Sequence, residues 1–90
     1  MPSCEATIIN KLGLHARAAA KFVSVANRFP CNIQVGRQAD SLCNGKNIMS
    51  VMMLAASKGT QLYIHAEGEQ AEQALLALQE LIAERFSEDS

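Results

Sequence analysis

Alternation of apolar and polar residues predicts the strands of this chain. The clearest case is Gln61–Glu67, in which Leu62, Ile64 and Ala66 share one face and His65 lies on the other. The other predicted strands cover residues 4–10, 31–35 and 41–43, with 36–40 as a hairpin loop between the last two. Because each alternating strand has one apolar side, we expect an antiparallel sheet with one covered face. His65 then lies on the open face, and no catalytic role is expected for it.

Apolar residues recur with helical spacing in three further stretches. The predicted helices cover residues 16–28, 48–56 and 71–86. Asn47 suits the N-cap of the second helix, and Pro30 stops the first because proline disfavours helix in the residue before it. After the third helix, the sequence from Phe86 to Ser90 reads as a polar tail that frays over about residues 87–90.

The order of elements is therefore strand, helix, strand, strand, helix, strand, helix. This order predicts an α+β fold, in which a four-stranded antiparallel sheet is covered on one face by three helices. Ninety residues are enough for one modest core, so residues 1–90 are expected to form a single domain.

Composition excludes several classes of function. The formal net charge of −1 provides too little positive field for a general nucleic-acid binder. No stretch approaches membrane-spanning length and no signal peptide is visible, so we expect a cytoplasmic protein without a membrane partner. Cys4, Cys31 and Cys43 lack C-x-x-C spacing and read as reduced thiols. A zinc site made by Cys31, Cys43 and His65 is conceivable but unsupported by spacing, so no metal and no cofactor are expected.

The second predicted helix is too apolar to be buried on every side in so small a domain. In one arrangement Val51 and Leu54 face the sheet, and all three methionines of the helix point outward. In the other, the inner face includes Met52 and leaves only Met49 and Met53 outside. Either arrangement exposes methionine, whose adaptable and polarisable side chain suits a surface that meets more than one partner.

One histidine lies where an extended segment turns into the first helix. Gly13 supplies backbone freedom for the turn, and His15 follows at or just before the first helical turn. A phosphoryl group on its imidazole would meet the backbone donors of Ala16 and Arg17 and the guanidinium of Arg17. The positive end of the helix dipole also disfavours protonation, which keeps the ring nucleophilic. The alternative is a capping or partly buried histidine without chemistry.

Two motifs resemble those of a known family. Residues 13–17, Gly-Leu-His-Ala-Arg, followed by small residues, resemble the active-site signature of HPr, the histidine phosphocarrier of the phosphoenolpyruvate phosphotransferase system. Residues 44–52 resemble the second signature of that family, and the chain length fits as well. The resemblance implies an open-faced β-sandwich, in agreement with the strand pattern, and we expect a monomer.

The resemblance also implies a function. His15 would accept a phosphoryl group on Nδ1 from phosphorylated enzyme I and pass it to a histidine of a downstream EIIA-type protein, with Arg17 stabilising the phosphate. Such a protein is a phosphoryl carrier rather than a stand-alone enzyme. The surface expected to dock these partners consists of Leu14, Lys21, Asn47, Ile48, Met49, Met52 and Met53.

The chain departs from the family pattern at two positions. Ala18 stands where the family commonly has proline, which loosens the first helical turn. Asn47 stands at the regulatory serine of some members and cannot be phosphorylated, so no regulatory serine is expected. The lead-in over residues 10–13, the missing serine and the acidic tail look more like the nitrogen-related branch, NPr. The alternatives are a sugar-transport HPr, or a regulatory binding module that acts through its phosphorylation state.

Overall fold

The computed structural model describes residues 2–87. Its elements, in chain order, are β1 (Ser3–Thr7), α1 (Ala16–Ala26), β2 (Asn32–Gln38), β3 (Ser41–Asn44), α2 (Ile48–Met52), β4 (Gln61–Glu67), α3 (Ala71–Ala83) and a final 3-10 turn, η1 (Arg85–Ser87). The expected α+β fold and its βαββαβα order are confirmed.

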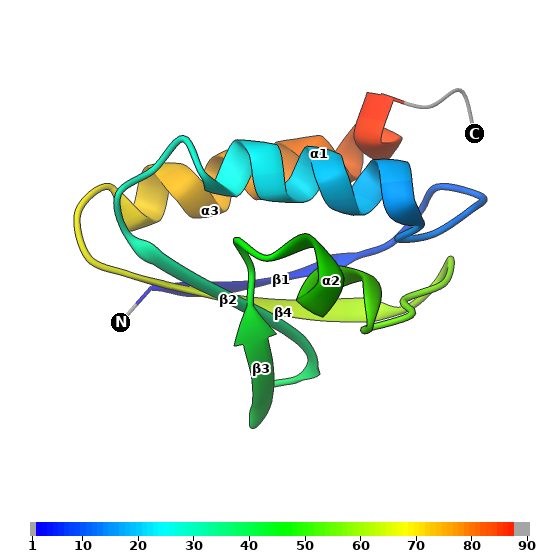
Figure 1. Cartoon of the computed structure of the whole chain (residues 1–90), viewed down its shortest axis with the longest axis horizontal. Helices are drawn as coiled ribbons and strands as arrows, with labels where there is room; N and C mark the ends of the chain where they lie inside the picture. The colour runs from blue at the N-terminus through cyan, green and yellow to red at the C-terminus, as the bar shows by residue number, and fades with distance from the viewer. Residues whose placement is uncertain (1, 88–90) are drawn as a thin grey trace.

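The four strands form one antiparallel sheet in the order β1-β4-β2-β3. β4 lies inside the sheet, where His65 is opposite Ser3 of β1 and Gln34 of β2. Figure 1 shows the helices on one face of this sheet, with α1 and α3 side by side and α2 beside α1. The predicted strand Gln61–Glu67 is confirmed with its inward and outward faces as expected.

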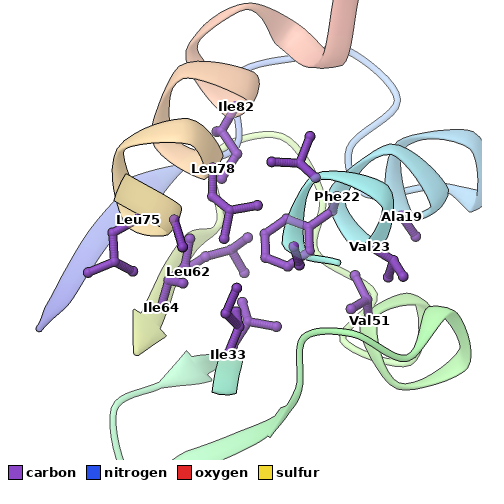
Figure 2. Close-up of a cluster of buried hydrophobic side chains, with 14 of the residues drawn as sticks. Ala19, Phe22, Val23, Ile33, Val51, Leu62, Ile64, Leu75, Leu78 and Ile82 are labelled. Atoms are coloured by element: carbon purple, nitrogen blue, oxygen red, sulfur yellow. The ribbon is translucent and has the colours of Figure 1, made fainter. Parts of the chain in front are cut away.

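The core lies between the sheet and the helices and is almost entirely aliphatic. Figure 2 shows Phe22 of α1 between Leu78 of α3 and the sheet residues Ile33 and Leu62. Each such side chain contributes about 1.5–3 kcal/mol of stability when it is fully buried. Val51 of α2 belongs to the same cluster, so this short helix is fixed to the core by one fully buried side chain.

Three strands differ from their predicted bounds. β3 ends at Asn44, one residue later than predicted. β1 ends at Thr7 rather than residue 10, because Ile8 bonds to the segment before β4. The Ile8 N–H donates to the Thr60 carbonyl (2.9 Å), and the Ile8 carbonyl accepts from the Gly59 N–H (2.7 Å). β2 runs on through Gln38, where a hairpin loop was predicted from residue 36. A side chain on Gly36 would meet the Ser41 carbonyl, with its Cβ 2.1 Å from the oxygen, so this glycine permits close strands rather than a turn.

The first two helices are shorter than predicted. α1 ends at Ala26 instead of residue 28, and the Arg28 N–H donates to the Val25 carbonyl (3.0 Å) in a tighter turn. α2 ends at Met52 instead of residue 56. Ala55 has φ +50°, a left-handed conformation that turns the chain away from the helix axis.

The chain after α3 differs from the predicted polar tail. α3 stops at Ala83 rather than at residue 86, and Arg85 and Phe86 take left-handed conformations (φ 57° and 54°). This reversal brings Phe86 into the core, where it is fully buried, so its assignment to a polar tail was wrong. The Lys21 ammonium donates to the Phe86 carbonyl (2.6 Å) and ties this turn to α1. Ser87 belongs to η1, and the rest of the predicted tail lies outside the described residues.

Candidate functional site

The turn before α1 is held by short contacts with the segment after α2. The buried Asn10 side chain donates from Nδ2 to the Gly13 carbonyl (2.8 Å). The Leu14 N–H donates to the Ala56 carbonyl (2.8 Å), which joins the two segments. Gly13 has φ +68°, and a Cβ there would lie 2.5 Å from the Ala56 oxygen. Glycine is therefore required at this position both by its conformation and by the close approach.

His15 is the N-cap residue of α1 and is partly exposed. Its extended backbone (φ −75°, ψ −179°) ends the turn, and its carbonyl accepts the first helical hydrogen bond, from Ala19 N–H at 2.8 Å. The amide groups of Ala16, Arg17 and Ala18 precede that bond, so they have no acceptor within the helix. In the described helix, the first turn carries no acidic side chain that would repel an anion. An anion on the His15 ring would thus meet amide donors and the positive end of the helix dipole.

Arg17 and Lys21, four residues apart on α1, form a cationic stripe whose two members lie in different surroundings. Arg17 is exposed, within the first turn of the helix that begins after His15. Lys21 is partly buried, and its ammonium is held by the Phe86 carbonyl, although it was placed on the docking surface. Arg17 is therefore the cation of this stripe that lies in the same helical turn as the free amide donors.

The expected docking surface needs one correction. Leu14 is only 4% exposed and packs in the core, so it offers no contact area to a partner. Leu12, which the sequence analysis did not single out, is 67% exposed in the same turn. A loop of this kind has no periodicity from which to tell the inward leucine from the outward one. The outward position of Leu12 comes from the tertiary turn fixed by Gly13.

α2 presents most of its apolar residues to solvent. Ile48 is 43% exposed, Met49 65%, Met52 37% and Met53 79%. Val51 is fully buried and Leu54 packs against the core, so the first of the two predicted arrangements is the observed one. We call these exposed side chains the methionine patch (Ile48, Met49, Met52 and Met53). α2 contacts α1, and the segment after α2 is bonded to the turn before His15, so the patch is a candidate surface near that turn.

Asn47 is the N-cap of α2, as predicted. Its Oδ1 accepts from the Ser50 N–H at 3.0 Å. Beside it, the Lys46 ammonium donates to the Phe29 carbonyl (2.6 Å) and so joins α2's lead-in to the chain after α1. The sequence also predicts Asn47 as part of the docking surface. Its side-chain oxygen is already engaged in the capping hydrogen bond of α2.

No metal centre is formed by the side chains of residues 2–87. This part of the chain has no group of three or more His, Cys, Asp or Glu residues placed to hold an ion, so Cys31, Cys43 and His65 do not form such a group. All three cysteines are free thiols, and burial raises the pKa of Cys4 and of Cys43. No helix within the described range is long and apolar enough to cross a bilayer.

A hollow of about 700 Å³ lies between the β2–β3 hairpin and the segment after α2. Arg37, Met53, Leu54 and Tyr63 are among its lining residues, and His15 is not. The imidazole therefore belongs to an open surface rather than to this hollow. Such a surface is completed by a second macromolecule more readily than by a small enclosed substrate.

Comparisons with known proteins agree with this geometry. The family described as "PTS HPr component phosphorylation site" matches residues 2–84. The phosphocarrier protein HPr of Pseudomonas aeruginosa is 66% identical over 88 residues, which cover 98% of each chain. The HPr of Xylella fastidiosa (Temecula1) is 45% identical over 86 residues, covering 96% of each chain.

Solved structures show the same fold. HPr-C-His from Thermoanaerobacter tengcongensis aligns with a TM-score of 0.92 at 40% identity, over 100% of both chains. HPr from Bacillus anthracis aligns with a TM-score of 0.83 at 38% identity, over 90% of this chain and 95% of that one. With a matching family, close relatives and a shared fold, this chain belongs to the HPr family of phosphocarrier proteins of the phosphotransferase system.

Proposed function

We propose that His15 carries the phosphoryl group, taking it from phosphorylated enzyme I and passing it to a histidine of an EIIA-type protein. The observation that carries this proposal is the placement of His15 at the start of α1, where the amides of Ala16 and Arg17 precede the first helical hydrogen bond. Membership of the HPr family supports the same reaction class. The protein is then a carrier that is used stoichiometrically, and it acts in the cytoplasm as a monomer.

In each transfer, one nitrogen–phosphorus bond breaks and another forms. The lone pair of unprotonated Nδ1 on His15, whose ring proton is on Nε2, attacks the phosphorus. The donor histidine, protonated on its other ring nitrogen, takes the electrons of the broken N–P bond and leaves as a neutral imidazole, while the Nε2 proton stays on phosphorylated His15. The phosphoryl oxygens carry the negative charge throughout, so amides and a guanidinium positioned in advance lower the barrier by holding them. Ala16 and Arg17 supply the amides, and Arg17 supplies the guanidinium. Transfer onward reverses these steps on the acceptor's histidine.

Ala18 adds a donor that the usual proline lacks. Its amide is the third that precedes the first helical hydrogen bond, and proline has no N–H. Alanine gives up the fixed backbone angle that proline would provide at this point. α1 nevertheless begins at Ala16, and buried Ala18 packs in the core. The substitution therefore exchanges rigidity for one further group that faces the phosphoryl site.

The methionine patch and Leu12 provide the docking surface for both partners. Enzyme I and an EIIA-type protein must each reach His15, so they bind the same side of the carrier in turn. Methionine side chains adapt to different contours at little energetic cost, which suits a surface with two partners. Lys21 contributes mainly through its link to Phe86, because that bond already holds its ammonium.

We assign the chain to the nitrogen-related branch. This rests on the lead-in over residues 10–13, on Asn47 in place of a serine, and on the acidic end of the chain. Asn47 is an N-cap and has no hydroxyl to phosphorylate, so control by a serine kinase at this position is excluded by its chemistry. Transfer to a regulatory EIIA-type acceptor should therefore be faster than transfer to one of a sugar permease. Equal or reversed rates would favour a sugar-transport HPr.

The decisive test is labelling from phosphoenolpyruvate. With enzyme I from the same organism, the protein should acquire phosphate that is labile in acid and stable in base. The chain has two histidines, so His65→Ala is a matched control. His15→Ala should abolish labelling, and His65→Ala should leave it unchanged. Labelling that survives in His15→Ala would disprove the site, and absence of labelling in the parent protein would favour a binding module.

A further inference from the structure

The exposed methionine side chains of the described chain lie on α2 and directly after it. Met49 and Met53 lie well out in solvent, and Met52 is at the border of exposure. The three residues lie within five positions of one another, with Met49 and Met52 on α2 and Met53 directly after it, and α2 contacts α1. A thioether exposed in this way is open to two-electron oxidants, whose product, the sulfoxide, is polar where the thioether was apolar.

The three thiols are partly or fully buried, unlike the exposed thioethers of Met49 and Met53. Cys31 is buried. Burial raises the pKa of Cys4, with the Glu5 carboxylate adding to the effect, and burial also raises the pKa of Cys43. The Cys43 thiol lies beneath α2, where Sγ donates to the Ser50 carbonyl at 3.5 Å. Thiols react as thiolates, so these groups are slow at neutral pH, whereas a thioether has no proton to lose.

We propose that Met49, Met52 and Met53 form an oxidation-sensitive site, and that their conversion to sulfoxides weakens the binding of enzyme I. The inference rests on the docking role given above to the methionine patch. The oxidant is a two-electron oxygen donor such as hydrogen peroxide. The sulfur lone pair attacks one peroxide oxygen, the O–O bond breaks, an S–O bond forms and water leaves. Methionine sulfoxide reductases reverse the change, taking two electrons from thiols and releasing water.

The effect should fall on docking and leave the fold intact. α2 is held by buried Val51, by Leu54 against the core and by the bond from Asn47 to Ser50, none of which involves a methionine side chain. A sulfoxide presents a strong hydrogen-bond acceptor that must lose its water when a partner covers it. Losing the apolar contact of one or two methionines should raise the Kd for enzyme I about tenfold or more.

The site of oxidation can be read from one peptide. Trypsin cleaves after Lys46 and Lys58, so Met49, Met52 and Met53 fall together in the peptide of residues 47–58, separate from Met1. The intact protein is treated with a graded series of hydrogen peroxide concentrations, and fragment ions give the sulfoxide content at each position. We expect Met49 and Met53 to oxidise first, and the cysteine-containing peptides to change more slowly. Faster modification of the cysteines would overturn the proposal.

The functional consequence is measured on the same samples. The Kd for enzyme I and the initial rate of phosphoryl transfer should worsen in proportion to sulfoxide at residues 49–53, with an unchanged Tm. Dithiothreitol, which reverses thiol oxidation, should restore nothing. The two methionine sulfoxide reductases, one for each epimer, should restore both quantities. Recovery with dithiothreitol alone would assign the effect to cysteine and overturn the proposal.

A variant with Met49→Leu, Met52→Leu and Met53→Leu sharpens the test. It is compared only with its own untreated form, whatever its starting rate, and peroxide should leave its Kd and rate unchanged. A tenfold loss in this variant would overturn the proposal. The proposed function is tested separately by labelling of untreated protein. Normal labelling together with full sulfoxide conversion and an unchanged Kd would disprove the oxidation site and leave the carrier function standing.

Discussion

α1 and α2 are neighbouring helices, and their N-termini differ in whether a side chain caps them. At α2 the cap residue is Asn47, and its side chain accepts a hydrogen bond from the Ser50 amide at 3.0 Å. At α1 the cap residue is His15, whose side chain makes no such capping bond in the described chain. One helix thus satisfies a terminal donor from its own sequence, and the other keeps its first amides available for a ligand.

This difference separates stability from function at the level of single residues. A capping side chain contributes about 0.5–2 kcal/mol to stability, and α1 forgoes that contribution. What α1 gains is a set of donors at which an anion on His15 can be held. None of the proposed phosphate-holding groups lies on α2, so its end can carry a capping side chain while its exposed methionines supply the proposed docking surface.

The largest expected effect is the loss of Arg17. Arg17→Ala removes a charge-assisted interaction worth about 1.5–3 kcal/mol with the phosphoryl oxygens, so transfer should slow roughly 10- to 100-fold. Tm should change little, because the side chain is exposed. Arg28→Ala, which removes another exposed cation after the same helix, is the control and should transfer normally. Equal transfer rates for the two variants would remove the role of Arg17.

A charge placed on the methionine patch should act on docking. Met49→Asp should raise the Kd for enzyme I about tenfold, because a carboxylate would have to be desolvated in an apolar contact. Leu76→Asp is a matched control on α3, where the leucine is 58% exposed. The two affinities can be compared by calorimetry, with circular dichroism to check the fold. If Met49→Asp binds enzyme I with unchanged affinity, the docking surface does not include this part of α2.

Removal of the α2 cap should reduce stability with a smaller effect on transfer. Asn47→Ala deprives the Ser50 amide of its acceptor and should cost about 1 kcal/mol, seen as a Tm lower by a few degrees. Asn47→Asp keeps the acceptor and should retain most of the stability. If both variants unfold at the same temperature as the parent protein, the Asn47 cap does not stabilise α2.

The smallest effect is a gain in stability at His15. His15→Asn introduces a preferred capping side chain at α1, which should raise stability by about 0.5–1 kcal/mol while labelling is lost. His15→Ala lacks a capping oxygen and should not show the gain. If His15→Asn and His15→Ala unfold at the same temperature, the lack of a capping side chain at α1 does not measurably lower the stability of the protein.

Local pattern was sufficient for the bounds of β4 and for the position of His15. The alternation of Gln61–Glu67 fixed β4 with both its ends, because an antiparallel strand with one buried face carries its whole pattern in sequence. Gly13, followed by an alanine-rich helical pattern, placed His15 at the helix start. The arrangement of α2 was narrowed to two possibilities, and the core contact of Leu54 selects one.

The helix ends and the loop leucines depended on distant contacts. α2 ends at Met52 and α3 at Ala83, and each is followed within three residues by a left-handed residue, Ala55 or Arg85, which no propensity favours. The left-handed conformation at Ala55 allows the Ala56 carbonyl to accept the hydrogen bond from Leu14, and the one at Arg85 allows Phe86 to pack in the core. These are contacts between segments far apart in sequence.

The close approach at Gly13 has a consequence for association. The backbone before His15 rests on the backbone of Ala56 with no room for a methyl group, and the Leu14 N–H bonds to the same carbonyl. The chain that follows the methionine patch is therefore fixed against the chain that precedes the phosphoryl site. A partner that binds the methionine patch finds the segment of His15 already held at a fixed distance from that patch. Little conformational entropy is therefore lost when the complex forms, and release after transfer can remain fast.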